Sequence, residues 1–142
     1  MDFERMAQEY METMYYMRKV NSHKQIHDSV HGENFVLFFI SQNGGKVIPS
    51  DISNEMGISS ARVAAALNSL EKKGLIARRI DAEDRRRILI DLTDLGKEQV
   101  ESHYRMIMSM IKNMLQYLGE KDASEFIRIM KRLAEKGPEG FK

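Results

Sequence analysis

One continuous stretch decides the fold: residues 48–93 read IPSDISNEMGISSARVAAALNSLEKKGLIARRIDAEDRRRILIDLT. Pro49 suits the first turn of a helix, where its missing N–H is not needed, and Gly57 ends that helix because glycine tolerates a positive φ. Ser59 is placed to cap a second helix, which Gly74 closes. The beginning of the stretch therefore predicts two short helices joined by a tight turn.

The second of these helices has an apolar face and a polar face. Val63, Leu67 and Leu70 recur at spacings of four and three residues, which places them together on an inward face. The residues left on the outer face are small or polar, namely Ser60, Ala61, Arg62, Ala65, Asn68 and Ser69. A helix, a glycine turn and a second helix form the arrangement that lays the second helix in a DNA major groove.

A charged hairpin is expected after Gly74. Residues 75–80 and 87–92 are strand-like, and Ile88, Ile90 and Leu92 alternate with the residues between them. The loop between the two runs, residues 81–86, reads Asp-Ala-Glu-Asp-Arg-Arg. Its arginines would project beyond the body of the protein, as in a wing that contacts phosphate or the minor groove.

The whole stretch resembles the winged helix of the MarR (multiple antibiotic resistance regulator) family of transcription factors. The family pattern Leu-Glu-Lys-Lys-Gly-Leu-Ile is met by residues 70–76, its Asp-x-Arg wing by residues 84–86, and Leu-Thr-x-x-Gly by residues 92–96. Many folds carry a helix-turn-helix, but this run of motifs in order and at family spacing is specific. Two positions depart from the pattern: Ile48 stands where a capping Thr or Ser is usual, and Ser53 where a small apolar residue is common.

The resemblance implies a mainly α fold with a small β-wing (α+β), in which a winged helix-turn-helix is flanked by N- and C-terminal dimerisation helices. We expect a single MarR-like domain over residues 1–142, with the winged-helix DNA-binding region at 32–96 and dimerisation helices in 1–31 and 97–142. The chain length is compatible with one domain.

Apolar spacing of three and four residues predicts the helices on both sides of this region. A first helix is expected over residues 2 to about 29, and a buried one over 33–42, followed by a short strand at 46–48. Thr93 is expected to cap a long helix that ends at Gly119, and a last helix runs from Asp122 to just before Gly137. The apolar stripes at both chain ends predict a symmetric homodimer.

The charge distribution favours DNA as the partner. The net charge is only +1, so affinity for DNA has to come from local charge. Between Ser59 and Ile90, eight basic residues stand against four acidic ones: Arg62, Lys72, Lys73, Arg78, Arg79, Arg85, Arg86 and Arg87 against Glu71, Asp81, Glu83 and Asp84. Basic residues on a helix are more often plain solvated surface, but their place in a winged-helix pattern favours nucleic acid.

Nine residues are predicted to contact double-stranded DNA: Ser59, Ser60, Ala61, Arg62, Ala65, Asn68, Arg85, Arg86 and Arg87. Arg62 is the candidate for a base contact, because Arg pairs bidentately with guanine, while alanines can touch thymine methyl groups and Ser or Asn can bond base edges or phosphate. A carboxylate is repelled by phosphate, so Asp84 is expected to brace an arginine of the wing. The alternative is that Asp84 only shapes the turn.

Other classes of function find little support. The chain has no Cys, which excludes a disulfide framework and a thiol sensor. It has no Gly-rich phosphate loop and no Ser, His and acid set at a recognisable spacing, so neither an enzyme nor a cofactor is expected. Without a long apolar run or signal-peptide features, a cytoplasmic protein with no membrane contact is expected. A winged-helix protein-interaction module, with the same fold and no DNA, stays open.

The sequence offers candidate residues for two kinds of regulatory site. His23, His27 and His31 are four residues apart and could hold a metal, but further ligands are needed, and only Asp28, Glu33 and the distant His103 are on offer. Such histidines are more often solvated or packed, and a metal-responsive regulator stays an alternative. Many MarR relatives respond to small aromatic anions, and Tyr15, Tyr16 and Phe38 could line a cleft for such an effector, although residues of these kinds are more often core.

Overall fold

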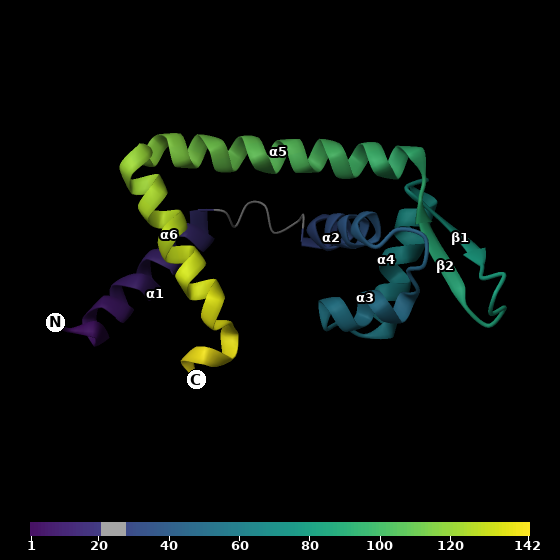
Figure 1. Ribbon diagram of the computed structural model, residues 1–142, viewed down its shortest axis with the longest axis horizontal. Helices are drawn as coiled ribbons and strands as arrows, with labels where there is room; N and C mark the ends of the chain where they lie inside the picture. The colour runs from purple at the N-terminus through teal and green to yellow at the C-terminus, as the bar shows by residue number, and fades with distance from the viewer. Residues whose placement is uncertain (21–27) are drawn as a thin grey trace. The chain divides into compact units, whose positions relative to one another are not determined.

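The computed structural model describes residues 1–20 and 28–142, and it is mainly helical (Figure 1). In chain order its elements are α1 (Phe3–Val20), α2 (Asp28–Gln42), α3 (Pro49–Met56), α4 (Ser60–Lys72), β1 (Ile76–Ile80), β2 (Ile88–Leu92), α5 (Asp94–Leu118), α6 (Glu120–Lys136) and the short 3-10 helix η2 (Pro138–Phe141). The predicted fold class, α-helical with a small β-wing, is confirmed. Chain contacts divide the molecule into two compact units, Met1–Val100 and Glu101–Lys142.

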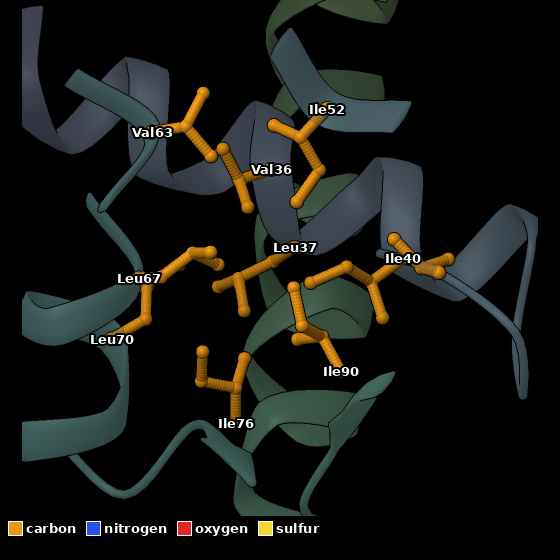
Figure 2. Close-up of a cluster of buried hydrophobic side chains, with 10 residues drawn as sticks. Val36, Leu37, Ile40, Ile52, Val63, Leu67, Leu70, Ile76 and Ile90 are labelled. Atoms are coloured by element: carbon orange, nitrogen blue, oxygen red, sulfur yellow. The ribbon is translucent and has the colours of Figure 1, made fainter. Parts of the chain in front are cut away.

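The first unit has an apolar core that joins α2, α3, α4 and both strands. The buried side chains labelled in Figure 2 point toward one another: Val36, Leu37, Ile40, Ile52, Val63, Leu67, Leu70, Ile76 and Ile90. Val47 belongs to the same cluster. Val63, Leu67 and Leu70 are the residues that helical spacing predicted to face inward, and they are the buried residues of α4. One face of α4 therefore packs against the core.

The two strands form an antiparallel hairpin. Ile76 pairs with Leu92 at the open end and Ile80 with Ile88 near the loop. Each strand begins one residue later than predicted. The expected strand at 46–48 is reduced to one bridge, in which the Ile90 N–H donates to the Val47 carbonyl at 2.9 Å.

Several helix boundaries differ from the sequence-based prediction. α2 begins at Asp28, five residues before the predicted start at Glu33, so it includes Gly32. The boundary expected between the N-terminal dimerisation helix and the DNA-binding region, after residue 31, therefore lies within α2. Of the predicted first helix, Phe3–Val20 is described as helix, and residues 21–27 lie outside the described part. At the other end, α6 begins at Glu120, because Gly119 ends α5 without a longer loop.

Helices α1 and α6 expose their apolar stripes in the single chain. On α6, Phe126, Ile129, Met130 and Leu133 are between 41% and 55% exposed, and the helix has no buried residue. On α1, the side chains at the predicted spacing are also exposed: Phe3, Met6, Tyr10, Met14 and Met17. Burying apolar surface is favourable, so these faces are suited to contact a partner.

Leu70→Ala tests the role of the core. Leu70 is fully buried, so the substitution removes apolar contacts and leaves a cavity. We expect the free energy of unfolding in urea to fall by about 2–5 kcal/mol. Leu95→Ala, at an exposed position in the first turn of α5, serves as the control and should change it by less than about 0.5 kcal/mol. Equal effects of the two substitutions would contradict this assignment.

Candidate nucleic-acid interface

The turn between α3 and α4 is closed by short hydrogen bonds. Gly57 adopts φ 65°, and its N–H donates to the Ser53 carbonyl at 2.9 Å. The Ser53 hydroxyl donates to the Ile58 carbonyl at 2.7 Å across the turn. At the other end of α3, the Asp51 carboxylate accepts the Ile48 N–H at 3.1 Å. Ser53 thus closes the turn with its hydroxyl. At Ile48, whose side chain cannot accept a hydrogen bond, Asp51 still makes the reciprocal half of a capping box by accepting the Ile48 N–H.

Helix α4 begins at a polar cap and presents one open face. The Ser59 hydroxyl accepts the Arg62 N–H at 3.2 Å, as expected for an N-cap. The six residues of this segment that were predicted to contact DNA are all exposed: Ser59, Ser60, Ala61, Arg62, Ala65 and Asn68. Because Val63, Leu67 and Leu70 are buried, the fold itself selects which side of α4 is available.

The Arg62 guanidinium is available for a ligand. It borders a hollow of about 390 Å³, whose other lining residues include Glu33, Met56 and Ile58. Glu33 is an obvious partner for it, but that carboxylate pairs with the Lys73 ammonium at 2.6 Å. Among the described residues, the Arg62 side chain has no hydrogen bond or ion pair.

Asn68 is held by an arginine that sequence reasoning missed. Arg78, on β1, donates from Nη2 to the Asn68 Oδ1 at 2.7 Å, and its Nε lies 3.2 Å from a carboxylate oxygen of Glu71. A guanidinium can only donate, so the amide oxygen of Asn68 has to face it. The amide NH2 of Asn68 is thereby left to donate elsewhere.

A second arginine ties the hairpin to the body of the unit. Arg79 donates from Nε to Asp91 at 2.7 Å and from Nη2 to the Gly45 carbonyl at 2.9 Å. Asp91 lies opposite Ala77, on the neighbouring strand, and Gly45 lies in the connection between α2 and α3. The hairpin is therefore joined to the connection between α2 and α3 by Arg79 as well as by the Val47–Ile90 bridge.

The tip of the hairpin is organised by Asp84. Its carboxylate accepts the backbone N–H of Arg86 at 3.1 Å and also the Nε and Nη2 groups of the same arginine at 3.1 and 3.3 Å. The hydrogen bond from the Arg86 side chain, helped by its backbone N–H, holds the pKa of the Asp84 carboxyl below its ordinary range. Asp84 therefore makes both contacts that the sequence left open, since it shapes the turn and pairs with an arginine.

The two neighbours of Arg86 are less constrained. Arg85 has no hydrogen bond or ion pair of its side chain among the described residues, and it is exposed. The Arg87 backbone closes the loop, because its N–H donates to the Asp84 carbonyl at 2.9 Å and its carbonyl accepts the Asp81 N–H at 3.0 Å. The wing thus has an ordered backbone and exposed guanidinium groups.

The residues proposed for an effector or a metal are less well placed. Tyr15 and Tyr16 lie on α1 and Phe38 on α2, at 69%, 66% and 47% exposure. Tyr15 borders a hollow on α1, and neither Tyr16 nor Phe38 lines it. His23 and His27 lie outside the described residues, and within the described ranges no group of three or more His, Asp or Glu could hold a metal ion. None of the helices described here is long and apolar enough to cross a membrane.

The titration of Asp84 provides a test of the wing tip. Its lowered pKa means that the carboxylate stays ionised at pH values where a free Asp side chain is already protonated, and that the contact with Arg86 is lost only as the pH falls through the folded-state pKa. Between about pH 5 and pH 8 the pair should therefore be unaffected by pH. In a 13C NMR titration of the carboxyl, Arg86→Gln should raise the Asp84 pKa toward its ordinary value.

Arg85→Gln is the matched control in that titration, because Arg85 is adjacent but makes no bond to Asp84. It should leave the Asp84 midpoint nearly unchanged. An equal shift in both variants would show that general positive charge, and not the Arg86 contact, lowers the pKa.

Known regulatory proteins are similar to this chain. A model of the MarR family matches residues 35–87, which include α3, α4, β1 and the loop of the hairpin. The uncharacterized HTH-type transcriptional regulator YdgJ of Bacillus subtilis (strain 168) is 31% identical over 97 residues, which are 68% of this chain and 59% of that protein. The uncharacterized HTH-type transcriptional regulator YwhA of the same organism is 31% identical over 101 residues, 71% of this chain and 72% of that protein. The chain thus spans less than two thirds of YdgJ and more than two thirds of YwhA.

A solved structure supports the fold assignment over nearly the whole chain. Streptococcus pneumoniae FabT in complex with DNA matches with a TM-score of 0.67 and 22% identity, over 94% of this chain and 96% of that one. Two further relatives from Bacillus subtilis are named transcriptional repressors. The relatives are regulators, in agreement with the expectation that the chain is not an enzyme. The chain belongs to the MarR family of winged-helix transcriptional regulators.

Proposed function

We propose that this chain acts as a homodimeric, sequence-specific DNA-binding repressor, in which the α4 helices of two copies enter successive major grooves of a near-palindromic site. The observation that carries the proposal is the exposed face of α4, where the Arg62 side chain has no partner among the residues that the structure describes, together with a wing that has three arginines. The DNA in the FabT structure and the repressor names of two relatives support it by analogy.

The N-terminal part of α4 is where base contacts are expected. Recognition helices of this motif read base edges mainly with their first residues, and Arg62 is the third residue of α4. A free guanidinium can pair with the O6 and N7 acceptors of guanine. Ala61 and Ala65 are small enough to allow close approach and to touch a thymine methyl group, while Ser59 and Ser60 can bond phosphate or base edges.

Asn68 is restricted in what it can read. A bidentate contact with adenine needs both the amide oxygen and the amide nitrogen of an Asn. Because the oxygen of Asn68 accepts from Arg78, the side chain presents donors toward the outside. In the proposed complex Asn68 therefore favours an acceptor, such as a guanine edge or a phosphate oxygen.

The wing acts by position and not by net charge. Residues 81–87 contain three arginines and three carboxylates, so their formal charges cancel. Asp84 is paired with Arg86, and within residues 1–20 and 28–142 no carboxylate is hydrogen-bonded to the side chain of Arg85 or Arg87. Close to DNA, these two arginines would meet phosphate or the minor groove, where positive side chains are favoured.

The exposed apolar faces of α1 and α6 support the dimer. Monomers rarely expose large contiguous apolar surface, and each of these helices exposes a stripe of apolar side chains. In a symmetric dimer a two-fold axis relates the two copies, so the same apolar side chains of each copy would lie in the interface.

Arg62→Ala and Arg85→Ala should alter DNA binding in different ways. Loss of Arg62 should weaken binding to a selected duplex by about 1–3 kcal/mol per base contact, relax the preference at one symmetric pair of positions, and affect random DNA less. Loss of Arg85 should weaken selected and random duplexes alike, and reduce the slope of log affinity against log salt by about one per phosphate contact. Fluorescence anisotropy across a salt series measures both effects.

Lys142→Ala is the charge-matched control, since Lys142 is an exposed cation of the chain end that pairs with Glu139. It should change neither base preference nor salt slope. If the Arg62 and Arg85 variants bind like the parent, these two residues are wrongly assigned. If the parent itself binds no duplex, the alternative function, a winged-helix protein-interaction module, is favoured.

The dimer can be measured directly. Light scattering at micromolar protein should give twice the mass of one chain, because two copies cover apolar faces that one copy leaves in water. Phe126→Glu together with Leu133→Glu on α6 should shift the mass toward that of a single chain. A folded parent that stays monomeric at this concentration would overturn the dimer.

A further inference from the structure

The carbonyl groups of Gly74 and Leu75 stand directly after the recognition helix. At the end of α4, Gly74 adopts φ 75°, its N–H donates to the Glu71 carbonyl at 2.9 Å, and the Leu75 N–H donates to the Leu70 carbonyl at 3.0 Å. This pair of bonds is the Schellman closure of a helix. It fixes the direction of both following carbonyl groups relative to α4.

Thr93 binds both of these carbonyls. Its backbone N–H donates to the Leu75 carbonyl at 3.1 Å, and its hydroxyl donates to the Gly74 carbonyl at 2.6 Å. The same hydroxyl accepts the Gly96 N–H at 3.0 Å, which caps the first turn of α5. One threonine side chain therefore joins the end of the recognition helix to the beginning of α5.

Gly96 permits this close approach. It is buried, and a Cβ built at this position would lie far inside van der Waals contact with the carbonyl oxygen of Leu75. That oxygen belongs to the backbone and already accepts from Thr93, so it cannot move aside without breaking the contact. A larger residue at 96 would push the first turn of α5 away from the turn that follows α4.

We propose that Thr93 and Gly96 are positioning residues for DNA recognition. Their contacts with Gly74 and Leu75, which we call the Thr93 clasp, fix the orientation of α4 relative to the first turn of α5. Because α5 is one uninterrupted helix from Asp94 to Leu118, a rotation of its first turn is carried along its length. In a dimer, the clasp sets the separation and angle of the two recognition helices without touching DNA. The inference rests on the proposed function.

The readout that follows from this role is the preferred spacing between half-sites. For a dimeric helix-turn-helix protein this spacing is a geometric property of the two recognition helices. Duplexes bound by the parent are first selected from a random-sequence library. The selected site is then rebuilt with its central spacer shortened or lengthened by one base pair, and the affinity of each duplex is measured.

The parent should prefer the selected spacer by about tenfold, because a rigid dimer has to deform DNA to fit another spacing. Thr93→Val has nearly the same shape as Thr but loses both hydroxyl contacts, and it should reduce this ratio to about twofold. Gly96→Ala should do the same by displacing the helix. Thr93→Ser keeps the hydroxyl and should restore the ratio of the parent.

Gly32→Ala is the matched control for the glycine substitution. Gly32 also lies within a helix, and a Cβ there would meet nothing within 4 Å. It should leave the spacing ratio unchanged. Loss of folded protein lowers the apparent affinity for every spacer equally, so the ratio separates positioning from stability, and Thr93→Val decides the question if Gly96→Ala does not fold.

The possible failures can be told apart. If the parent selects no duplex, the proposed function fails and the inference fails with it. If the parent binds DNA with no spacing preference, or if Thr93→Val keeps the ratio of the parent, the Thr93 clasp has no positioning role while DNA binding stands.

Discussion

The apolar contact among α2, α4 and β2 is the constraint on which the rest of the first unit depends. Leu37, Leu70 and Ile90 come from these three elements and are almost fully removed from water. Burial of each such side chain contributes about 1.5–3 kcal/mol, whereas an exposed ion pair contributes about 0–1 kcal/mol. The arginine contacts at the surface therefore add little to the stability of the fold. Their role is to orient groups that the core has already brought near one another.

The features that the sequence predicts best are those decided by neighbours along the chain. The inward face of α4 follows from the spacing of Val63, Leu67 and Leu70, and the ends of α3 and α4 follow from Gly57 and Gly74. Thr93 could be recognised as a cap because capping involves residues only three apart. The exposed face of α4 and the wing tip could be anticipated for the same reason.

The contacts that could not be predicted join residues far apart in the chain. Lys73 meets Glu33 from 40 positions away, and Arg79 reaches the Gly45 carbonyl from 34. The local sequence pattern does not show which arginine of a basic stretch is hydrogen-bonded within the protein. From the sequence, Arg78 is therefore only one of eight basic residues, although in the structure it determines how Asn68 is oriented. Helix α2 begins five residues before its predicted start and continues through Gly32, although glycine has a low helix propensity.

The one-sided burial of α4 also has an evolutionary consequence. Apart from Ser59, which also caps the helix, the residues that would read DNA are not the buried residues that hold α4, so a substitution at Ser60, Ala61 or Ala65 removes no contact of the core. Mutational drift on that face is therefore nearly neutral for folding, and a duplicated gene could acquire a new target site by a few exchanges without passing through an unstable intermediate. The same helix could not be moved alone into another protein as a peptide, since 13 residues without their apolar support are too few to remain helical in water.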